Sequence, residues 1–109
     1  MKTRSETIAQ INDALRIMQV GGEVMLTQGI VNLPPVTRDK IIQAMREYDD
    51  FAPDGDPYGE HDFGTFEVDG FKCFFKITYF DPTMEFGSDD PANPEVTKRV
   101  LTLMLAEEY

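Results

Sequence analysis

The sequence has a single cysteine, Cys73, and no long apolar run. A lone cysteine excludes an intrachain disulfide, and a reducing compartment is the default for such a chain. No apolar stretch approaches the roughly 20 residues that cross a bilayer. Residues 1–20 also lack the basic-then-apolar pattern of a signal peptide. We therefore expect a cytoplasmic protein.

Basic residues are scarce. The chain has 10 lysines and arginines against 20 acids, which gives a formal net charge of −10. Binding to phosphates needs a basic footprint, so this balance excludes nucleic acid and anionic membranes as direct partners. It leaves cations, basic proteins, and proteins that normally hold nucleic acid.

Apolar residues repeat at helical spacing in the first half of the chain. Thr3 and Glu6 have the spacing of a capping box, and Pro35 stands where a first-turn proline is tolerated. With 109 residues the chain is long enough for one core and no more. We expect a single domain, 1–109, whose first elements are a helix over 5–19, a strand over 24–27 and a helix over 36–48.

A β-hairpin is the best-defined local feature. Asp69-Gly70 is a two-residue turn of the kind that prefers positive φ. It sets Glu67 opposite Lys72, a favourable cross-strand pair. On the other face it predicts the pairs Val68–Phe71, Phe66–Cys73, Gly64–Phe75 and Asp62–Ile77.

The C-terminal segment shows a helix-start signal. Asn93, Pro94 and Glu95 are suited to an N-cap, a first-turn proline and a dipole-favoured acid, and the run 100–106 is apolar. These features predict a buried final helix. The expected fold is α+β, in the order α-β-α-β-β-α, with helices packed on a mainly antiparallel three-stranded sheet.

The acids collect in two segments, 49–62 and 81–95, which contain no lysine or arginine. Both segments join the open end of the hairpin, so we expect them at one pole of the molecule. This pole is the predicted partner-binding surface, formed by Asp49, Asp50, Asp54, Asp56, Glu60, Asp81, Glu85, Asp89 and Asp90. Ordinary turn chemistry is the plainer explanation, because aspartate favours turns.

The segment DGDPYGEHD, residues 54–62, is the alternative candidate site. It begins like an EF-hand loop, but Tyr58 stands at the fifth position of that pattern and Thr65 at the twelfth, where a bidentate glutamate is required. A looser Ca²⁺ or Mg²⁺ site would use Asp54, Asp56, Asp62 and Asp81. Catalysis would use His61 with Glu60 or Asp62, but no nucleophile lies nearby, so a structural hydrogen bond is the favoured interpretation for this histidine.

Several longer motifs resemble one family. The segments 51–64 (FAPDGDPYGEHDFG), 74–82 (FFKITYFDP) and 87–109 (GSDDPANPEVTKRVLTLMLAEEY) are similar to a family of small, mainly alphaproteobacterial proteins of unknown function. The resemblance implies a stand-alone domain in a bacterial cytoplasm. It implies no activity, cofactor or catalytic residue. The setting of the family on plasmids points towards conflict functions such as counter-defence.

Two functional hypotheses follow. The first is a non-enzymatic interaction protein, without a cofactor, whose acidic pole docks a basic protein surface. In its sharper form it mimics nucleic acid towards a nucleic-acid-binding protein. The alternative is a metal-dependent enzyme or divalent-cation-binding module centred on residues 54–62.

Overall fold

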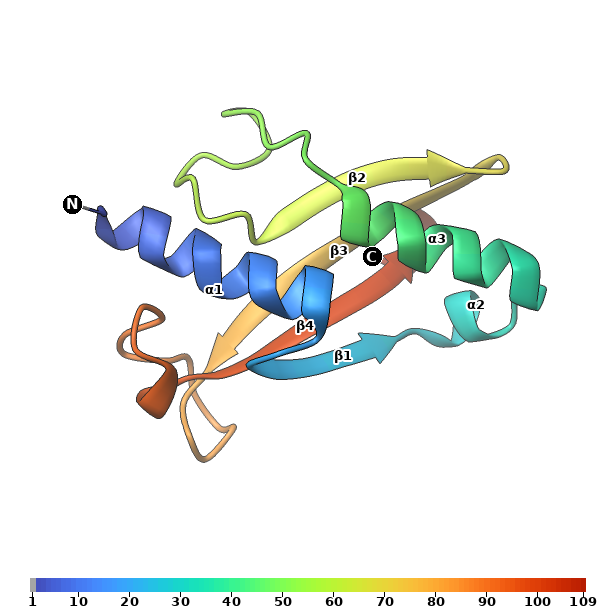
Figure 1. Ribbon diagram of the computed structural model, residues 1–109. Coiled ribbons are helices and arrows are strands. Elements are labelled where there is room, and N and C mark those ends of the chain that lie inside the picture. Colours follow the sequence, from blue (N-terminus) through green and yellow to red (C-terminus); the bar gives the residue numbers. More distant parts are fainter. Residues whose placement is uncertain (1) are drawn as a thin grey trace.

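The computed structural model describes residues 2–109 (Figure 1). The described chain forms two long helices, three short helical segments and four strands. In order, they are α1 (Arg4–Met18), β1 (Gly22–Leu26), α2 (Gln28–Val31), α3 (Pro35–Glu47), β2 (Phe63–Val68), β3 (Phe71–Phe80), η1 (Pro94–Val96), β4 (Lys98–Leu105) and η2 (Ala106–Glu108).

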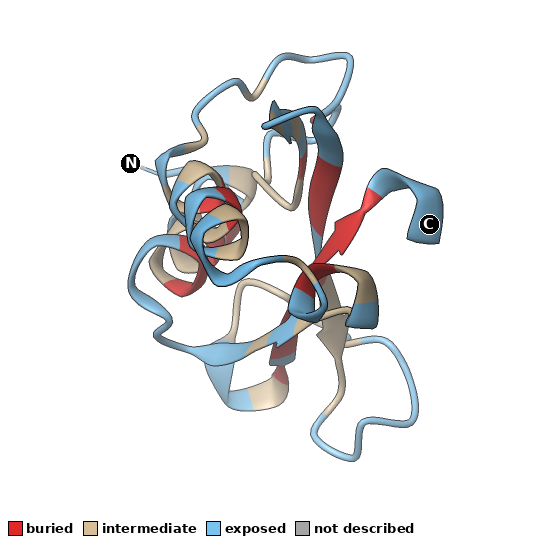
Figure 2. Cartoon of the chain, turned by 90° about the vertical axis from the view of Figure 1, so that its right-hand side faces the viewer, coloured by how far each residue is buried: buried red, intermediate tan, exposed pale blue. Residues whose placement is uncertain are grey.

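The strands form one mixed sheet in the order β1-β4-β3-β2. Strand β4 pairs parallel with β1 and antiparallel with β3, while β2 and β3 form the hairpin. Both α1 and α3 cover the same face of this sheet (Figures 1 and 2). The core lies between these two layers, where fully buried side chains from the helices meet those from the strands: Leu15, Ile41, Met45, Phe75, Leu101 and Leu103.

The first two predicted helices and the hairpin are confirmed. The side chain of Thr3 accepts a hydrogen bond from the backbone N–H of Glu6, which completes the capping box of α1. The hairpin has the expected register, with Glu67 opposite Lys72. At the open end of the hairpin, just beyond the paired residues, the backbone N–H of Ile77 donates to the carbonyl oxygen of Asp62 at 2.8 Å.

The predicted final helix is wrong. Residues 98–105 form β4, and the signal at Asn93 caps only the short 3₁₀ turn η1. Because β4 has neighbouring strands on both sides and buried residues on both faces, its sequence is an almost continuous apolar run. Such a run has no periodicity that distinguishes a buried strand from a buried helix. The sheet consequently has four strands with one parallel pair, not three mainly antiparallel ones.

The second face of the sheet is not covered by α1 or α3 (Figure 2). The ring of Phe74 is nonetheless buried there, because Phe63 and Tyr109 pack against it with ring centroids 5.4 and 4.8 Å away. Within the described part of the chain, no helix is both long enough and apolar enough to span a membrane.

Candidate functional site: an anchored acidic loop beside His61

The segment 49–62 connects α3 to β2 without regular structure, and Asp56 folds it back on itself. The carboxylate of Asp56 is almost fully buried and accepts hydrogen bonds from the backbone N–H groups of Glu60, at 2.9 Å, and His61, at 3.1 Å. Asp56 was predicted to bind a partner or a metal. The structure instead places it inside the loop, where it holds the turn.

His61 adopts a left-handed backbone conformation, with φ of +57°. Its ring stacks on Phe51 at a centroid distance of 4.0 Å, nearly parallel. Its Nδ1 atom lies 3.0 Å from the carboxylate of Asp13 in α1. The sequence suggested Glu60 or Asp62 as its partners, but the contact comes from a helix 48 positions earlier in the chain.

Asp13 is shared between His61 and Arg16, whose guanidinium lies 3.0 Å from the same carboxylate. The Arg16 side chain is buried and lies over the ring of Phe51 at 5.2 Å. It also donates to three backbone carbonyls where α3 ends, those of Met45, Arg46 and Tyr48. Arg16 therefore fixes α1 to the start of the acidic loop.

A second buried network lies beside the first, centred on Asn12. The Asn12 amide group donates to the hydroxyl of Tyr79 at 2.8 Å and to the backbone carbonyl of Glu60 at 3.0 Å, and its oxygen accepts from Arg99 at 2.8 Å. The hydroxyl of Tyr79 donates to the Glu60 carboxylate at 2.9 Å. Burial raises the pKa of Tyr79 and lowers the pKa of Arg99. Arg99 also donates to the carbonyl of Pro91, which connects this network to the second acidic segment.

The sequence contains a signal for these contacts that our prediction did not use. Ile8, Asn12 and Leu15 have the spacing of one helix face, and all three are fully buried. A polar residue on an apolar stripe needs a buried hydrogen-bond partner, so Asn12 marks where another polar segment must approach α1.

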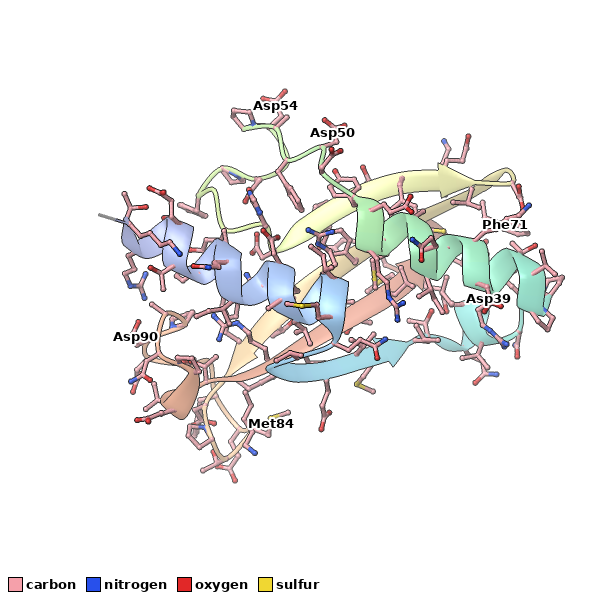
Figure 3. The ribbon with its side chains drawn as sticks, viewed as in Figure 1. Asp39, Asp50, Asp54, Phe71, Met84 and Asp90 are labelled. Atoms are coloured by element: carbon pink, nitrogen blue, oxygen red, sulfur yellow. The ribbon has the colours of Figure 1, made fainter. Side chains whose placement is uncertain are left out.

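Three carboxylates of the first segment face solvent. Asp49, Asp50 and Asp54 are exposed and form no ion pair with any of the described residues. Figure 3 shows Asp50 and Asp54 on the outer side of the loop, pointing away from the sheet. Asp62, by contrast, is half-buried, and burial raises the pKa of its carboxyl.

Two acids of the second segment already have partners within the protein. Asp81 accepts from the Thr83 hydroxyl at 2.8 Å, and this hydrogen bond lowers the pKa of the Asp81 carboxyl. Asp90 forms an ion pair with Arg4 at 3.2 Å. Glu85 and Asp89 are exposed.

The two acidic segments lie on opposite sides of α1, one above the helix and one below it (Figures 1 and 2). Both are near the N-terminal end of α1, but the helix and the buried networks separate them. The structure therefore presents two acidic surfaces where the sequence suggested one. The larger set of unpaired carboxylates belongs to the segment 49–62.

The four carboxylates considered for a metal do not come together. Asp56 accepts hydrogen bonds from backbone N–H groups, Asp54 faces solvent, and Asp81 belongs to the segment 81–95, which lies on the other side of α1. Among residues 2–109, no three histidine, cysteine, aspartate or glutamate side chains are grouped so that they could hold a metal ion.

His61 borders two shallow hollows, of about 290 and 440 Å³. Neither is lined by a serine, threonine or cysteine that could serve as a nucleophile. The Tyr48 hydroxyl in the larger hollow donates to the backbone carbonyl of Asp50. The contacts of His61 are those of a residue that holds a loop in place.

Fold and site together define a small acidic α+β domain with an anchored, carboxylate-bearing loop. Comparison with known families places it more closely. Residues 26–108 match the family described as "Protein of unknown function (DUF3768)", and the chain belongs to that family. No curated protein and no solved structure gives a significant match.

Proposed function

We propose that this protein is a non-enzymatic interaction protein that docks a basic surface of another protein through Asp49, Asp50 and Asp54. The observation that carries the proposal is the state of these three side chains. They are exposed and unpaired within the described chain, on a segment without lysine or arginine.

The loop that bears them is held in one conformation. Asp56 closes its turn, and Phe51 is clamped between His61 and the Tyr48 ring, 4.0 and 4.9 Å away by ring centroids. A loop that is ordered before binding loses less conformational entropy when a partner arrives. Its negative potential also attracts a basic partner and speeds their encounter.

The partner class we favour is a nucleic-acid-binding protein, because its basic surface is built to accept closely spaced negative charge. Duplex DNA carries one charge per ~1.7 Å of its axis, so three carboxylates imitate only a short stretch of phosphates. Interference with such a protein would suit a counter-defence role.

The test compares two triple variants of equal net charge. D49N/D50N/D54N removes the loop carboxylates, while D39N/E67Q/E107Q removes three exposed acids elsewhere, and Asp39 lies on α3 at the far end from the loop (Figure 3). Binding is measured by calorimetry to two purified basic proteins, a bacterial nucleoid protein and lysozyme, over a range of salt. We expect the loop variant to bind the nucleoid protein about 10-fold more weakly than the control variant, with a shallower salt dependence.

Equal losses in the two variants would show that only net charge matters and would overturn the proposed site. Competition by duplex DNA tests mimicry separately. If DNA does not displace the protein from the nucleoid protein, the mimicry is wrong even where docking holds.

The alternative proposal is a divalent-cation module or metal-dependent enzyme centred on residues 54–62. It has less support, because the Asp56 carboxylate already accepts hydrogen bonds from two backbone N–H groups. A thermal-shift measurement with Ca²⁺ and Mg²⁺ distinguishes the two, since a metal that binds only the folded state must raise the midpoint of unfolding. Stabilisation that is lost in D54N would favour the alternative.

A further inference from the structure

Charge is almost absent from one region of this highly charged protein. Residues 17–37 contain a single charged side chain, Glu23, in a chain in which 28% of residues are charged. The same region holds six of the eleven large apolar side chains that are exposed: Ile17, Met18, Val20, Met25, Val31 and Val36. Depletion of charge around exposed apolar groups is typical of the centre of a protein interface.

Strand β1 runs through this region and forms one edge of the sheet (Figure 1). Backbone groups of successive strand residues point to opposite edges. The N–H of Thr27 points inward, where it donates to the carbonyl of Leu103 at 3.1 Å. By alternation, Gly22, Val24 and Leu26 direct their N–H and C=O groups outward, away from β4.

Glu23 is the one charged side chain of β1, and the strand has none of the other usual protections of an edge. Natural edge strands carry lysine, proline or a bulge that prevents another strand from adding to them. Strand β1 has the sequence GEVML, with no lysine and no proline, and pairs with β4 in an uninterrupted register. Its outward backbone groups are therefore suited to receive another strand.

We propose that β1 pairs antiparallel with β1 of a second copy, across a two-fold axis at Val24. In this register Val24 faces its own counterpart, and Gly22 faces Leu26 of the second copy. Every residue with outward backbone groups then meets another of the same kind. The two sheets join into one, which is the β-augmentation mode of recognition in a symmetric form.

The self-complementary register favours a second copy as the occupant, and the low charge of this edge permits the contact. Two chains of net charge −10 repel each other over most of their surfaces, and this edge is where they can approach with little repulsion. The register also keeps the two Glu23 side chains apart, because each lies opposite Met25 of the other copy. The acidic loop lies beyond β2, at the opposite edge of the sheet, so the dimer leaves it free (Figure 1).

The test uses Met25, which is 53% exposed and can be changed without disturbing the core. M25E places a glutamate opposite Glu23 of the second copy, whereas M25K places a lysine there. The pair formed by residue 23 and residue 25 of the other copy occurs twice in the dimer. We therefore expect M25E to raise the Kd of the dimer and M25K to lower it, each by roughly 2- to 30-fold. The double variant E23K/M25E should restore association.

Sedimentation velocity over a concentration series gives the readout. The wild type should move from 12.4 kDa towards twice that mass as concentration rises. Tyr58, which is 75% exposed in the loop beyond the opposite edge, provides the matched controls Y58E and Y58K. A wild type that stays monomeric at about 1 mM would overturn the proposal, since such an interface would be weaker than any specific dimer. So would a dimer whose Kd responds equally to the Met25 and Tyr58 changes.

Discussion

At the scale of single residues, the carboxylates of the 49–62 loop other than Asp62 are of two kinds. Asp56 accepts a hydrogen bond from the backbone N–H of Glu60 at 2.9 Å and closes the turn, while the Glu60 carboxylate accepts from the Tyr79 hydroxyl at 2.9 Å and holds the loop against β3. Asp50 and Asp54 have no such partners and face water. Asp62 belongs to neither kind, because it is half-buried and its carboxylate lies near other acids.

Replacing Asp62 with asparagine should stabilise the protein at neutral pH by about 0.5 to 1 kcal/mol. Burial raises the pKa of Asp62 in the folded state, with Glu60 and Asp56 acting in the same direction. A raised pKa means that the folded protein holds the proton more tightly, so the stability contributed by this group is lost as pH rises through that pKa. The asparagine variant avoids this loss.

Urea unfolding of D62N and wild type at pH 7 and near pH 4 measures the effect. The gain in unfolding free energy of D62N over wild type should be smaller at the lower pH, where Asp62 of the wild type is protonated. D54N provides the control, since Asp54 is exposed. An advantage of D62N that is equal at both pH values would contradict the explanation.

The location of His61 could be predicted at this scale, but its contacts could not. A lone histidine beside a strand suggested a structural hydrogen bond, and the structure pairs its Nδ1 atom with the Asp13 carboxylate. Its partner lies on α1, far away in sequence, and nothing in the local pattern around His61 indicates which helix will pack there. The buried Asn12 on the apolar face of α1 was the usable clue.

At the scale of elements, the short C-terminal segment η2 connects parts of the fold that are distant in sequence. The Glu108 carboxylate accepts from the Thr27 hydroxyl at 2.6 Å, the Gly29 N–H at 3.0 Å and the Leu105 N–H at 2.9 Å. These bonds join the end of β4 to the start of α2. The hydrogen bond with Thr27 is the main cause of the lowered pKa of Glu108.

Replacing Glu108 with glutamine should destabilise the protein at neutral pH by about 1 kcal/mol or less, because solvent screens this exposed group. A lowered pKa in the folded state gives stability that is present above the ordinary pKa and is lost as pH falls through the lowered one. The difference in stability between E108Q and wild type should therefore become smaller at acid pH. Thermal unfolding from neutral to acid pH checks this. E107Q, at the exposed neighbouring position, should differ little from wild type at any pH.

Element types were predictable wherever the pattern was periodic or a turn was specific. The capping box at Thr3 and the turn at Asp69-Gly70 both formed as expected. Strand β4 was not predictable by the same means, because an apolar run that is buried on both faces lacks periodicity. The tertiary partners of Lys98–Leu105, not its local preferences, decide that it is a strand.

At the scale of the whole molecule, one buried network fixes both acidic segments. Asn12 holds the first through the backbone of Glu60, and Arg99 holds the second through the carbonyl of Pro91. Asn12 and Arg99 are themselves hydrogen-bonded at 2.8 Å, so the two anchors are one structure. The sequence predicted that both acidic segments lie at one pole, but α1 and this network lie between them.

Asn12→Ala should destabilise the protein by about 2 to 3 kcal/mol, because it removes the buried hydrogen-bond partner of the Arg99 Nε–H group and of the Glu60 backbone carbonyl. Denaturant unfolding measures the loss, with the exposed neighbouring change Gln10→Ala as the control. The rate of backbone amide hydrogen exchange should increase both in the segment 49–62 and in residues 81–93 of the second segment. An increase confined to one segment would show that the two loops are anchored independently.

The order of the strands sets when this protein can acquire its structure during synthesis. Strand β4 follows the other three strands in the sequence, yet it lies between β1 and β3 in the sheet. Until it emerges, β1 has no neighbour to hydrogen-bond and β3 has only its hairpin partner. The nascent chain must therefore wait with its apolar strand faces uncovered, and a stop codon even a few residues before Leu105 would release a polypeptide that cannot close its core.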